Sequence, residues 1–263
     1  RFLKKEGYQT LPRRPLEKRK LRYEDVYPVL YLKYRLSWQA ERSNIKHLVI
    51  DEMQDYSRLQ YLIIRRMFSC KMTILGDRAQ TMADQQQDVL QFLPGIFGKN
   101  LRRIELRKSY RNTVEIASYA ANLIGVTDLE LFERHGMPVL ERNVTDLEAA
   151  LREAVDTLFP DEKTYETAAV IVPDEKTAER AYLILREILA EKDFDCEKRL
   201  SWLNRDSSSF KKGLTVTTFY LAKGLEFDQV FSIFPKDEKR EMMMQAQYIA
   251  ATRALHELRV YHI

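Results

Sequence analysis

Short apolar runs that end in polar residues alternate with stretches of helical periodicity along most of the chain. Strands are predicted at 45–51, 72–76, 101–106, 168–172, 214–219, 230–234 and 258–262. Helices are predicted at 59–68, 113–124, 146–159, 175–190 and 242–255, and residues 125–145 are expected to form loops. Because buried strands that alternate with amphipathic helices pair in parallel and are covered on both faces, the sequence predicts an α/β fold with parallel sheets.

The length of 263 residues allows one large domain or two of ordinary size. The alternation is interrupted near residues 95–100 by Pro94, Gly95, Gly98 and Asn100. These residue types punctuate chains at turns and boundaries. We therefore expect two domains, residues 1–98 and residues 99–263, each long enough to bury its own core.

The composition excludes several protein classes. Hydrophobic residues make up 45% and charged residues 31%, which is typical of a globular chain and not of a disordered one. No apolar run approaches the roughly 20 residues of a membrane-spanning helix, so no membrane association is expected. Cys70 and Cys196 are the two cysteines and stand far apart, which excludes a disulfide framework and favours a reducing compartment, the cytoplasm.

Positive charge is concentrated at the beginning of the chain. Residues 1–22 hold nine Lys or Arg against two Glu, a net +7, which leaves −3 for the remainder of a chain whose total is +4. Such an arm could follow a phosphate backbone. It could equally be a solvated connecting segment, because acidic residues resume at Glu24 and Asp25.

Two adjacent carboxylates follow the first predicted strand, in Leu48-Val49-Ile50-Asp51-Glu52-Met53-Gln54-Asp55. Ligands of parallel sheets bind outside the carboxyl ends of strands, so such strand ends are the first places to look for chemistry. This pattern has the shape of a Walker B element, in which the first carboxylate holds Mg²⁺ and the second orients or deprotonates a water. The alternative is a strand end with solvated acids.

Four further segments follow this element in order, and together the five segments resemble the motifs of a known family. They are 74–80 (Ile-Leu-Gly-Asp-Arg-Ala-Gln), 106–112 (Leu-Arg-Lys-Ser-Tyr-Arg-Asn), 217–228 and 248–254 (Tyr-Ile-Ala-Ala-Thr-Arg-Ala). With residues 48–55 they resemble motifs II to VI of the UvrD/Rep-type superfamily 1 helicases, over residues 45–259. The resemblance implies two RecA-like lobes of the P-loop NTPase fold with ATP between them, the first lobe being incomplete in residues 1–98.

The resemblance implies roles for the residues around the phosphates. Asp51 matches the aspartate associated with Mg²⁺, and Glu52 matches the catalytic glutamate. Gln80 matches the glutamine that senses the γ-phosphate. Arg111 and Arg253 match the two arginines that reach the γ-phosphate from the second lobe, a task that suits the guanidinium group. Ordinary surface ion pairs are the alternative for both arginines.

Other matched positions concern the base, the ribose and the nucleic acid. Tyr110 matches an aromatic residue that stacks on adenine, with core packing as the alternative. Glu226 matches the glutamate on the ribose, with local pairing as the alternative, and Gly224 would lie beside the phosphates. Thr218 and Tyr220 are the candidate contacts with nucleic acid.

One motif of the family is missing from this sequence. A P-loop needs two glycines five positions apart, followed by Lys and Ser or Thr, and no pair of the eight glycines has that separation. The family carries this element upstream of motif II. We therefore expect the chain to be the C-terminal part of a longer helicase-like protein.

Two departures from the family pattern keep several functions open. Residues 81–83 (Thr-Met-Ala) lack the aromatic residue that stacks on bases in DNA-tracking members, and Tyr220 stands where His is usual. These features resemble the HelD, or helicase IV-like, branch. The parent protein could be an ATP-dependent 3′-to-5′ DNA helicase or translocase on single-stranded DNA, or a HelD-like remodeller of RNA polymerase. A non-catalytic interaction domain is the third possibility.

We predict that the purified chain hydrolyses ATP negligibly, because it has neither the lysine nor the glycine-rich backbone of a P-loop to hold the phosphates. Phosphate release measured with Mg²⁺ and again with a chelator checks this. Magnesium-dependent turnover by this chain would contradict the prediction.

Overall fold

The computed structural model describes residues 21–36, 42, 44–77, 88–98, 101–106, 108–127, 130–158, 165–192, 194–207, 212–236 and 241–263. The chain divides into two compact units. Unit 1 comprises residues 1–76 and 87–102, and unit 2 comprises residues 77–86 and 103–263. The domain boundary predicted between residues 98 and 99 differs from this division and stays a prediction.

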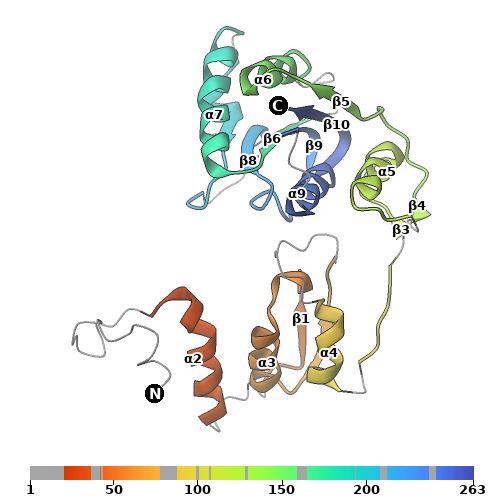
Figure 1. Cartoon of the computed structure of the whole chain (residues 1–263), viewed down its shortest axis with the longest axis vertical. Coiled ribbons are helices and arrows are strands. Elements are labelled where there is room, and N and C mark those ends of the chain that lie inside the picture. The colour runs from red at the N-terminus through yellow and green to blue at the C-terminus, as the bar shows by residue number, and fades with distance from the viewer. Residues whose placement is uncertain are drawn as a thin grey trace, which may run out of the picture. The chain divides into compact units, whose positions relative to one another are not determined.

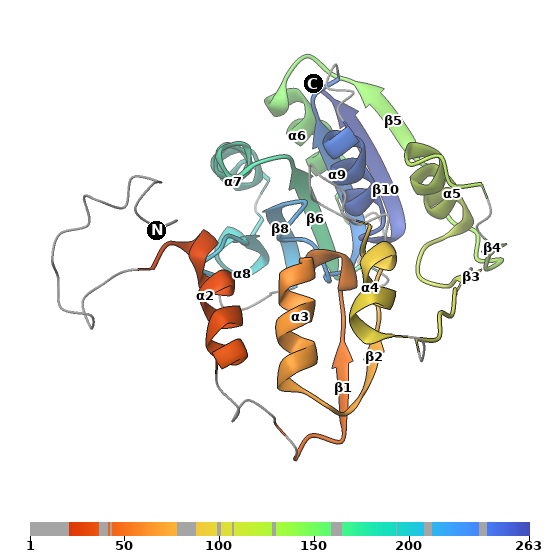
Figure 2. The ribbon, with the colours of Figure 1, turned by 60° about the horizontal axis from the view of Figure 1, so that its bottom comes forward.

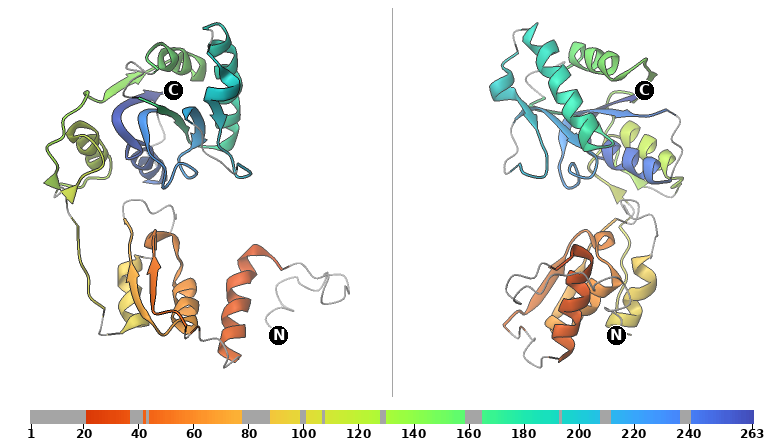
Figure 3. Two further views of the ribbon diagram at one scale, coloured as in Figure 1. Left: turned by 180° about the vertical axis from the view of Figure 1, so that it is seen from behind. Right: turned by 60° about the vertical axis from the view of Figure 1, so that its left-hand side comes forward.

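Unit 1 contains a pair of parallel strands and several helices (Figure 3). Its elements are α2 (Tyr23–Leu36), β1 (His47–Ile50), the 3₁₀ turn η3 (Met53–Asp55), α3 (Arg58–Met67), β2 (Lys71–Ile74) and α4 (Val89–Phe97). Helix α3 starts at a capping box, in which Ser57 and Gln60 satisfy each other's backbone N–H groups. Ile50, Tyr61, Val89 and Leu93 form the buried centre of the unit.

Unit 2 contains two parallel sheets and five helices among its described residues (Figure 1). The small sheet pairs β3 (Lys108–Ser109) with β4 (Glu130–Leu131). The strands of the large sheet are β5 (Leu140–Asn143), β6 (Thr167–Val172), β7 (Leu200–Trp202), β8 (Gly213–Thr218), β9 (Phe227–Phe234) and β10 (Ala254–His262). The helices are α5 (Val114–Leu123), α6 (Leu147–Asp156), α7 (Glu175–Ala190), α8 (Cys196–Arg199) and α9 (Glu241–Ala251).

The large sheet has the strand order β5-β10-β9-β6-β8-β7, and every pairing in it is parallel. Helices α6 and α7 pack on one face, and α5 and α9 pack on the other (Figures 1 and 2). The α/β fold with parallel sheets predicted from the sequence is confirmed, and this arrangement is the one expected of a RecA-like lobe.

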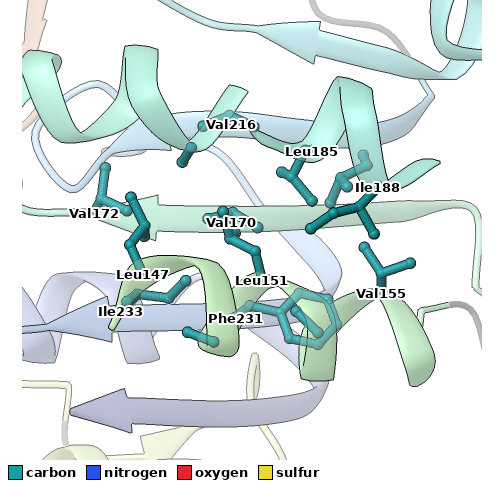
Figure 4. Close-up of a cluster of buried hydrophobic side chains, with 14 of the residues drawn as sticks. Leu147, Leu151, Val155, Val170, Val172, Leu185, Ile188, Val216, Phe231 and Ile233 are labelled. Carbon is teal, nitrogen blue, oxygen red and sulfur yellow. The ribbon is translucent and has the colours of Figure 1, made fainter. Parts of the chain in front are cut away.

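The central strand β6 shows why its sequence is apolar without interruption. Alternate residues of a strand face opposite sides of the sheet. Ala168, Val170 and Val172 pack toward α6 and α7 (Figure 4), whereas Ala169 and Ile171 pack toward α5 and α9. All five side chains are completely buried. Burial of a valine or isoleucine contributes about 1.5–3 kcal/mol, so both layers of helices depend on this strand.

One predicted strand, at residues 101–106, is wrong. The segment forms no strand in the structure, and Leu101, Ile104 and Leu106 are exposed. A strand needs a neighbour for its backbone hydrogen bonds, and the ladders of the described residues include no partner for this segment. The strand begins instead at Lys108, opposite Glu130.

Smaller differences concern element ends and short strands. Helix α9 ends at Ala251 and β10 already begins at Ala254, so the predicted helix 242–255 is too long and the predicted strand 258–262 too short. Strands β4 and β5 lie within the stretch predicted as loops. Among the described residues, no helix is long and apolar enough to cross a membrane. Both cysteines are free thiols.

We predict that Gly213→Ala destabilises unit 2 by about 2–4 kcal/mol, as overpacking and backbone strain typically do. Gly213 has φ 114°, and a Cβ there would lie 2.1 Å from the carbonyl oxygen of Arg199. Urea unfolding measures the loss. Gly95→Ala is the control: it lies in α4 with open space around it and should be neutral or stabilising. Equal effects of the two substitutions would contradict the prediction.

Candidate functional site

The two carboxylates of unit 1 lie where the sequence predicts them, directly after β1. Asp51 is exposed and Glu52 is half-buried. Glu52 has φ 53° and ψ 50°, a left-handed conformation that is uncommon for residues other than glycine. Its backbone N–H donates to Asp51 Oδ1 at 2.8 Å, and Gln54 Nε2 donates to Glu52 Oε2 at 2.5 Å. Local hydrogen bonds thus fix both carboxylates at the strand end.

The turn that carries Glu52 is fastened to its neighbours through the backbone of Met53. Met53 N–H donates to Leu75 O at 2.8 Å, and Leu75 N–H donates to Ile50 O at 2.8 Å. The buried Tyr61 hydroxyl donates to Met53 O at 3.0 Å. Burial raises the pKa of Tyr61 well above its ordinary value, so this hydroxyl stays a donor.

Gly76 packs against the same turn, and sequence reasoning did not single it out for this. A Cβ at Gly76 would lie 2.4 Å from Gln54 Oε1 and 2.5 Å from Met53 Cγ. Only glycine therefore allows the segment after β2 to pass this close to the turn at Met53 and Gln54. The sequence does show a Gly-Asp pair at the end of the second predicted strand, which marks Gly76 as unusual. It does not show that Gly76 lies against Met53 and Gln54.

The carboxylates fit the chemistry of a magnesium site. Mg²⁺ is usually held by one or two carboxylates together with waters and substrate phosphates. Asp51 offers an exposed carboxylate at a strand end, and Glu52 lies beside it. When bound there, the ion would neutralise phosphate charge.

In unit 2, two predicted site residues lie at the amino-terminal edge of the large sheet. Glu226 directly precedes β9 and Arg253 directly precedes β10, and Phe227 lies opposite Ala254 in the register. Asp51 and Glu52 thus lie at the carboxyl end of a strand, whereas Glu226 and Arg253 lie on the segments that lead into β9 and β10.

Arg111 joins this edge through an ion pair. Its Nε lies 2.6 Å from Glu226 Oε1, and the two side chains are 45% and 41% exposed. This is the local pairing that the sequence left open as an alternative for both residues. The structure thus brings together two residues that are far apart in the sequence, and their roles toward a nucleotide stay predictions.

Arg253 is buried in unit 2, with 1% of its surface exposed. Its Nε donates to Ile249 O at 3.2 Å, its Nη1 to Leu225 O at 3.3 Å, and its Nη2 to Thr252 Oγ1 at 3.1 Å. The alternative of an ordinary surface ion pair is therefore wrong for Arg253. A role at a γ-phosphate would require the guanidinium to exchange these oxygens for phosphate oxygens.

Tyr110 presents its ring to solvent. It is 63% exposed and packs at 5.5 Å against Phe132, which is itself exposed, while Lys108 Nζ lies 5.6 Å from the centroids of both rings. The pairing of β3 with β4 brings the two rings together. Core packing, the alternative for Tyr110, is therefore wrong, because more than half of its surface faces solvent.

The other predicted residues of unit 2 lie elsewhere. Gly224 is exposed with φ 81° and has open space where a Cβ would be. Thr218 ends β8 opposite Val172, at the carboxyl edge, and is buried, so its hydroxyl presents no surface to a nucleic acid in this conformation. Tyr220 is half-buried, with the Arg205 guanidinium 6.0 Å from its ring centroid. Gln80 lies outside the described residues.

Sequence reasoning missed two side chains that hold this edge together. Buried Asn112 donates from Nδ2 to Thr252 O at 3.2 Å and to Ala254 O at 2.6 Å. Arg134 donates from Nη2 to Arg111 O at 2.7 Å and to Leu255 O at 2.5 Å. Asn112 belongs to the segment that resembles motif IV, but nothing in the sequence reveals its partners 140 and 142 positions away.

The start of α5, next to Asn112, is anchored in turn by Glu115. The Glu115 carboxylate accepts hydrogen bonds from His135 Nδ1 at 2.9 Å and from Gly136 N–H at 2.9 Å. The bond from His135 lowers the pKa of Glu115 to about 2, so the carboxylate stays ionised at neutral pH. Thr113 caps the helix by accepting the Ile116 N–H.

Comparison with known proteins adds a sequence match to this geometry. Residues 8–82 match the UvrD/REP helicase N-terminal domain family. The matched segment includes Asp51, Glu52 and Gly76. No curated protein matches the chain significantly.

Several solved structures that resemble this chain are described as helicases or helicase domains. One is the C-terminal domain of a possible DNA helicase from Lactobacillus plantarum WCFS1, with 24% identity, a TM-score of 0.46, and coverage of 59% of this chain and 88% of that one. Others are the PRRSV helicase (17%, TM-score 0.45) and the arterivirus helicase nsp10 solved with DNA (15%, TM-score 0.43). The matches to the two viral helicases each cover 82% of this chain, but this chain spans only 35% of the PRRSV helicase and 39% of the arterivirus helicase.

We predict that Arg111→Ala and Glu226→Ala each change the free energy of unfolding by less than about 1 kcal/mol, because exposed ion pairs contribute little to stability. Urea unfolding measures both. Arg142→Ala, which breaks the comparably exposed pair with Glu153, is the control. A loss of several kcal/mol at Arg111 or Glu226 alone would show that the pair is needed for the fold.

Proposed function

We propose that the chain is part of an ATP-dependent DNA helicase or translocase that moves along single-stranded DNA in the 3′-to-5′ direction. The observation that carries the proposal is the fixed acidic strand end, Asp51 and Glu52, inside the segment that matches the UvrD/REP helicase N-terminal domain. The arrangement of Tyr110, Arg111 and Glu226 in unit 2 supports it.

In unit 1, the proposed chemistry belongs to the two carboxylates. Asp51 would hold Mg²⁺, which would neutralise phosphate charge, and Glu52 would orient the attacking water or accept its proton. Gln54 and the left-handed backbone hold the Glu52 carboxylate in one orientation before substrate arrives. Such positioning is most of what phosphoryl transfer requires of a protein.

In unit 2, the proposed nucleotide contacts require the arginines to exchange partners. Arg111 exchanges the Glu226 carboxylate for phosphate oxygens, which leaves Glu226 available to a ribose hydroxyl. Arg253 gives up the carbonyl oxygens of Ile249 and Leu225. A phosphate is a charged and often bidentate partner for a guanidinium, whereas the carbonyl oxygens that Arg253 contacts now are neutral, so a triphosphate can stabilise the changed conformation of Arg253.

A HelD-like remodeller of RNA polymerase is the second candidate. It is favoured by Tyr220, which stands where the family usually has His and whose ring centroid lies 6.0 Å from the Arg205 guanidinium. The ATP chemistry would be the same, and only the partner would differ. ATPase activity stimulated by single-stranded DNA supports the helicase, whereas copurification of RNA polymerase subunits with the full-length protein supports the second candidate.

We predict that, in the full-length protein, Glu52→Gln leaves ATP binding largely intact and abolishes turnover. Arg253→Ala should lower kcat on the order of 10³-fold or more if the arginine contacts the transferred phosphate. Steady-state ATPase assays and nucleotide titrations measure both effects.

The exposed residues Glu148 and Arg142 provide matched controls, Glu148→Gln and Arg142→Ala, which should hydrolyse ATP normally. Because Arg253 is buried, thermal unfolding must show that Arg253→Ala is folded, and Arg253→Lys serves as the milder variant. Normal turnover by Glu52→Gln or by folded Arg253→Ala would contradict the assigned role.

A further inference from the structure

The Asn112 side chain lies between the two arginines of unit 2. Asn112 directly follows Arg111 in the sequence, and its amide nitrogen donates to the carbonyl groups on both sides of Arg253, those of Thr252 and Ala254. The residue is 6% exposed, so these bonds are shielded from water. One amide group therefore links the backbone of Arg111 to the backbone of Arg253.

Arg134 forms a second link between the same two segments. Its Nη2 donates both to Arg111 O and to Leu255 O. A third bond adds the segment of Glu226, because Phe227 N–H donates to Arg253 O at 2.9 Å. The loops that carry Arg111, Glu226 and Arg253 thus form one hydrogen-bonded assembly at the amino edge of the sheet.

We propose that Asn112 is a positioning residue that holds Arg111 and Arg253 at a fixed backbone separation, so that both can bind the terminal phosphate of one nucleoside triphosphate. The inference rests on the proposed function, since it assigns Asn112 to the same nucleotide site. Asn112 itself contacts neither phosphate nor metal; it acts through the two arginines.

A positioning role differs measurably from a purely structural one. If Asn112 only stabilised the fold, its loss would weaken the binding of all nucleotides equally or none. If it sets the spacing of two arginines that bind a γ-phosphate, its loss should weaken triphosphate binding and leave diphosphate binding unchanged. The ratio of the two affinities is therefore the decisive measurement.

The experiment titrates the chain with Mg·ATP and with Mg·ADP up to millimolar concentrations, followed by the NMR signals of backbone amides and arginine side chains. We expect the wild-type chain to bind ATP more tightly than ADP. Asn112→Ala should lose roughly tenfold in ATP affinity, the equivalent of one hydrogen bond to a charged group, with ADP affinity unchanged. Asn122→Ala, an exposed position on α5, is the matched control and should keep the preference.

Thermal unfolding accompanies each titration, because Asn112→Ala removes a buried hydrogen-bond donor. If that variant does not fold, Arg134→Met removes the second link and should reduce the ATP preference in the same direction. A folded Asn112→Ala chain that keeps the full preference, with only a lower melting temperature, would overturn the inference. A wild-type chain without any preference for ATP would also overturn the inference, whereas the proposed function is tested separately by the turnover of Glu52→Gln in the full-length protein.

Discussion

A parallel sheet that is covered by helices on both faces leaves side chains free for chemistry only at its two ends, where the strands begin and where they finish. In unit 2 the completely buried side chains of β6 pack against α6 and α7 on one face and against α5 and α9 on the other. The polar side chains that the structure gathers must therefore lie on the loops at the ends of the strands. Arg111, Glu226 and Arg253 do so at the amino-terminal edge.

At this end of the sheet, the charged side chain of Arg253 and the polar side chain of Asn112 are buried, which is unfavourable in free energy. A buried charged or polar side chain is unfavourable unless its hydrogen bonds are satisfied inside the protein. Arg253 meets this condition through carbonyl and hydroxyl oxygens of its own segment and of the loop before β9, and Asn112 through two carbonyl groups of the turn. Because hydrogen bonds require particular partners and directions, these groups select one arrangement of the loops. Apolar side chains at the same turn could pack in more than one way.

Regular elements with strong periodicity were predictable because their pattern reflects local geometry. The helix predicted at 175–190 has the bounds of α7, and the apolar run at 168–172 lies within β6. The run at 101–106 has the same apolar character, yet it forms no strand, since a strand also needs a partner. The order of short motifs predicted Asp51, Glu52, Tyr110 and Arg111 as site residues, and their roles stay predictions. Asn112 and Arg134 were missed because Thr252, Ala254 and Leu255, which accept their hydrogen bonds, lie far away in sequence.

The sequence by itself determined the α/β class, most of the central strands and helices, and the acidic end of β1, since each of these follows from local periodicity and from residue types at strand ends. Only the tertiary structure decided that Arg253 is buried, that Arg111 pairs with Glu226, and that Asn112 binds the turn on both sides of Arg253. The physical reason is that the Arg111–Glu226 pair and the Asn112 hydrogen bonds join segments more than 100 residues apart, and no periodicity in the sequence records which loops a sheet brings to the same end of its strands.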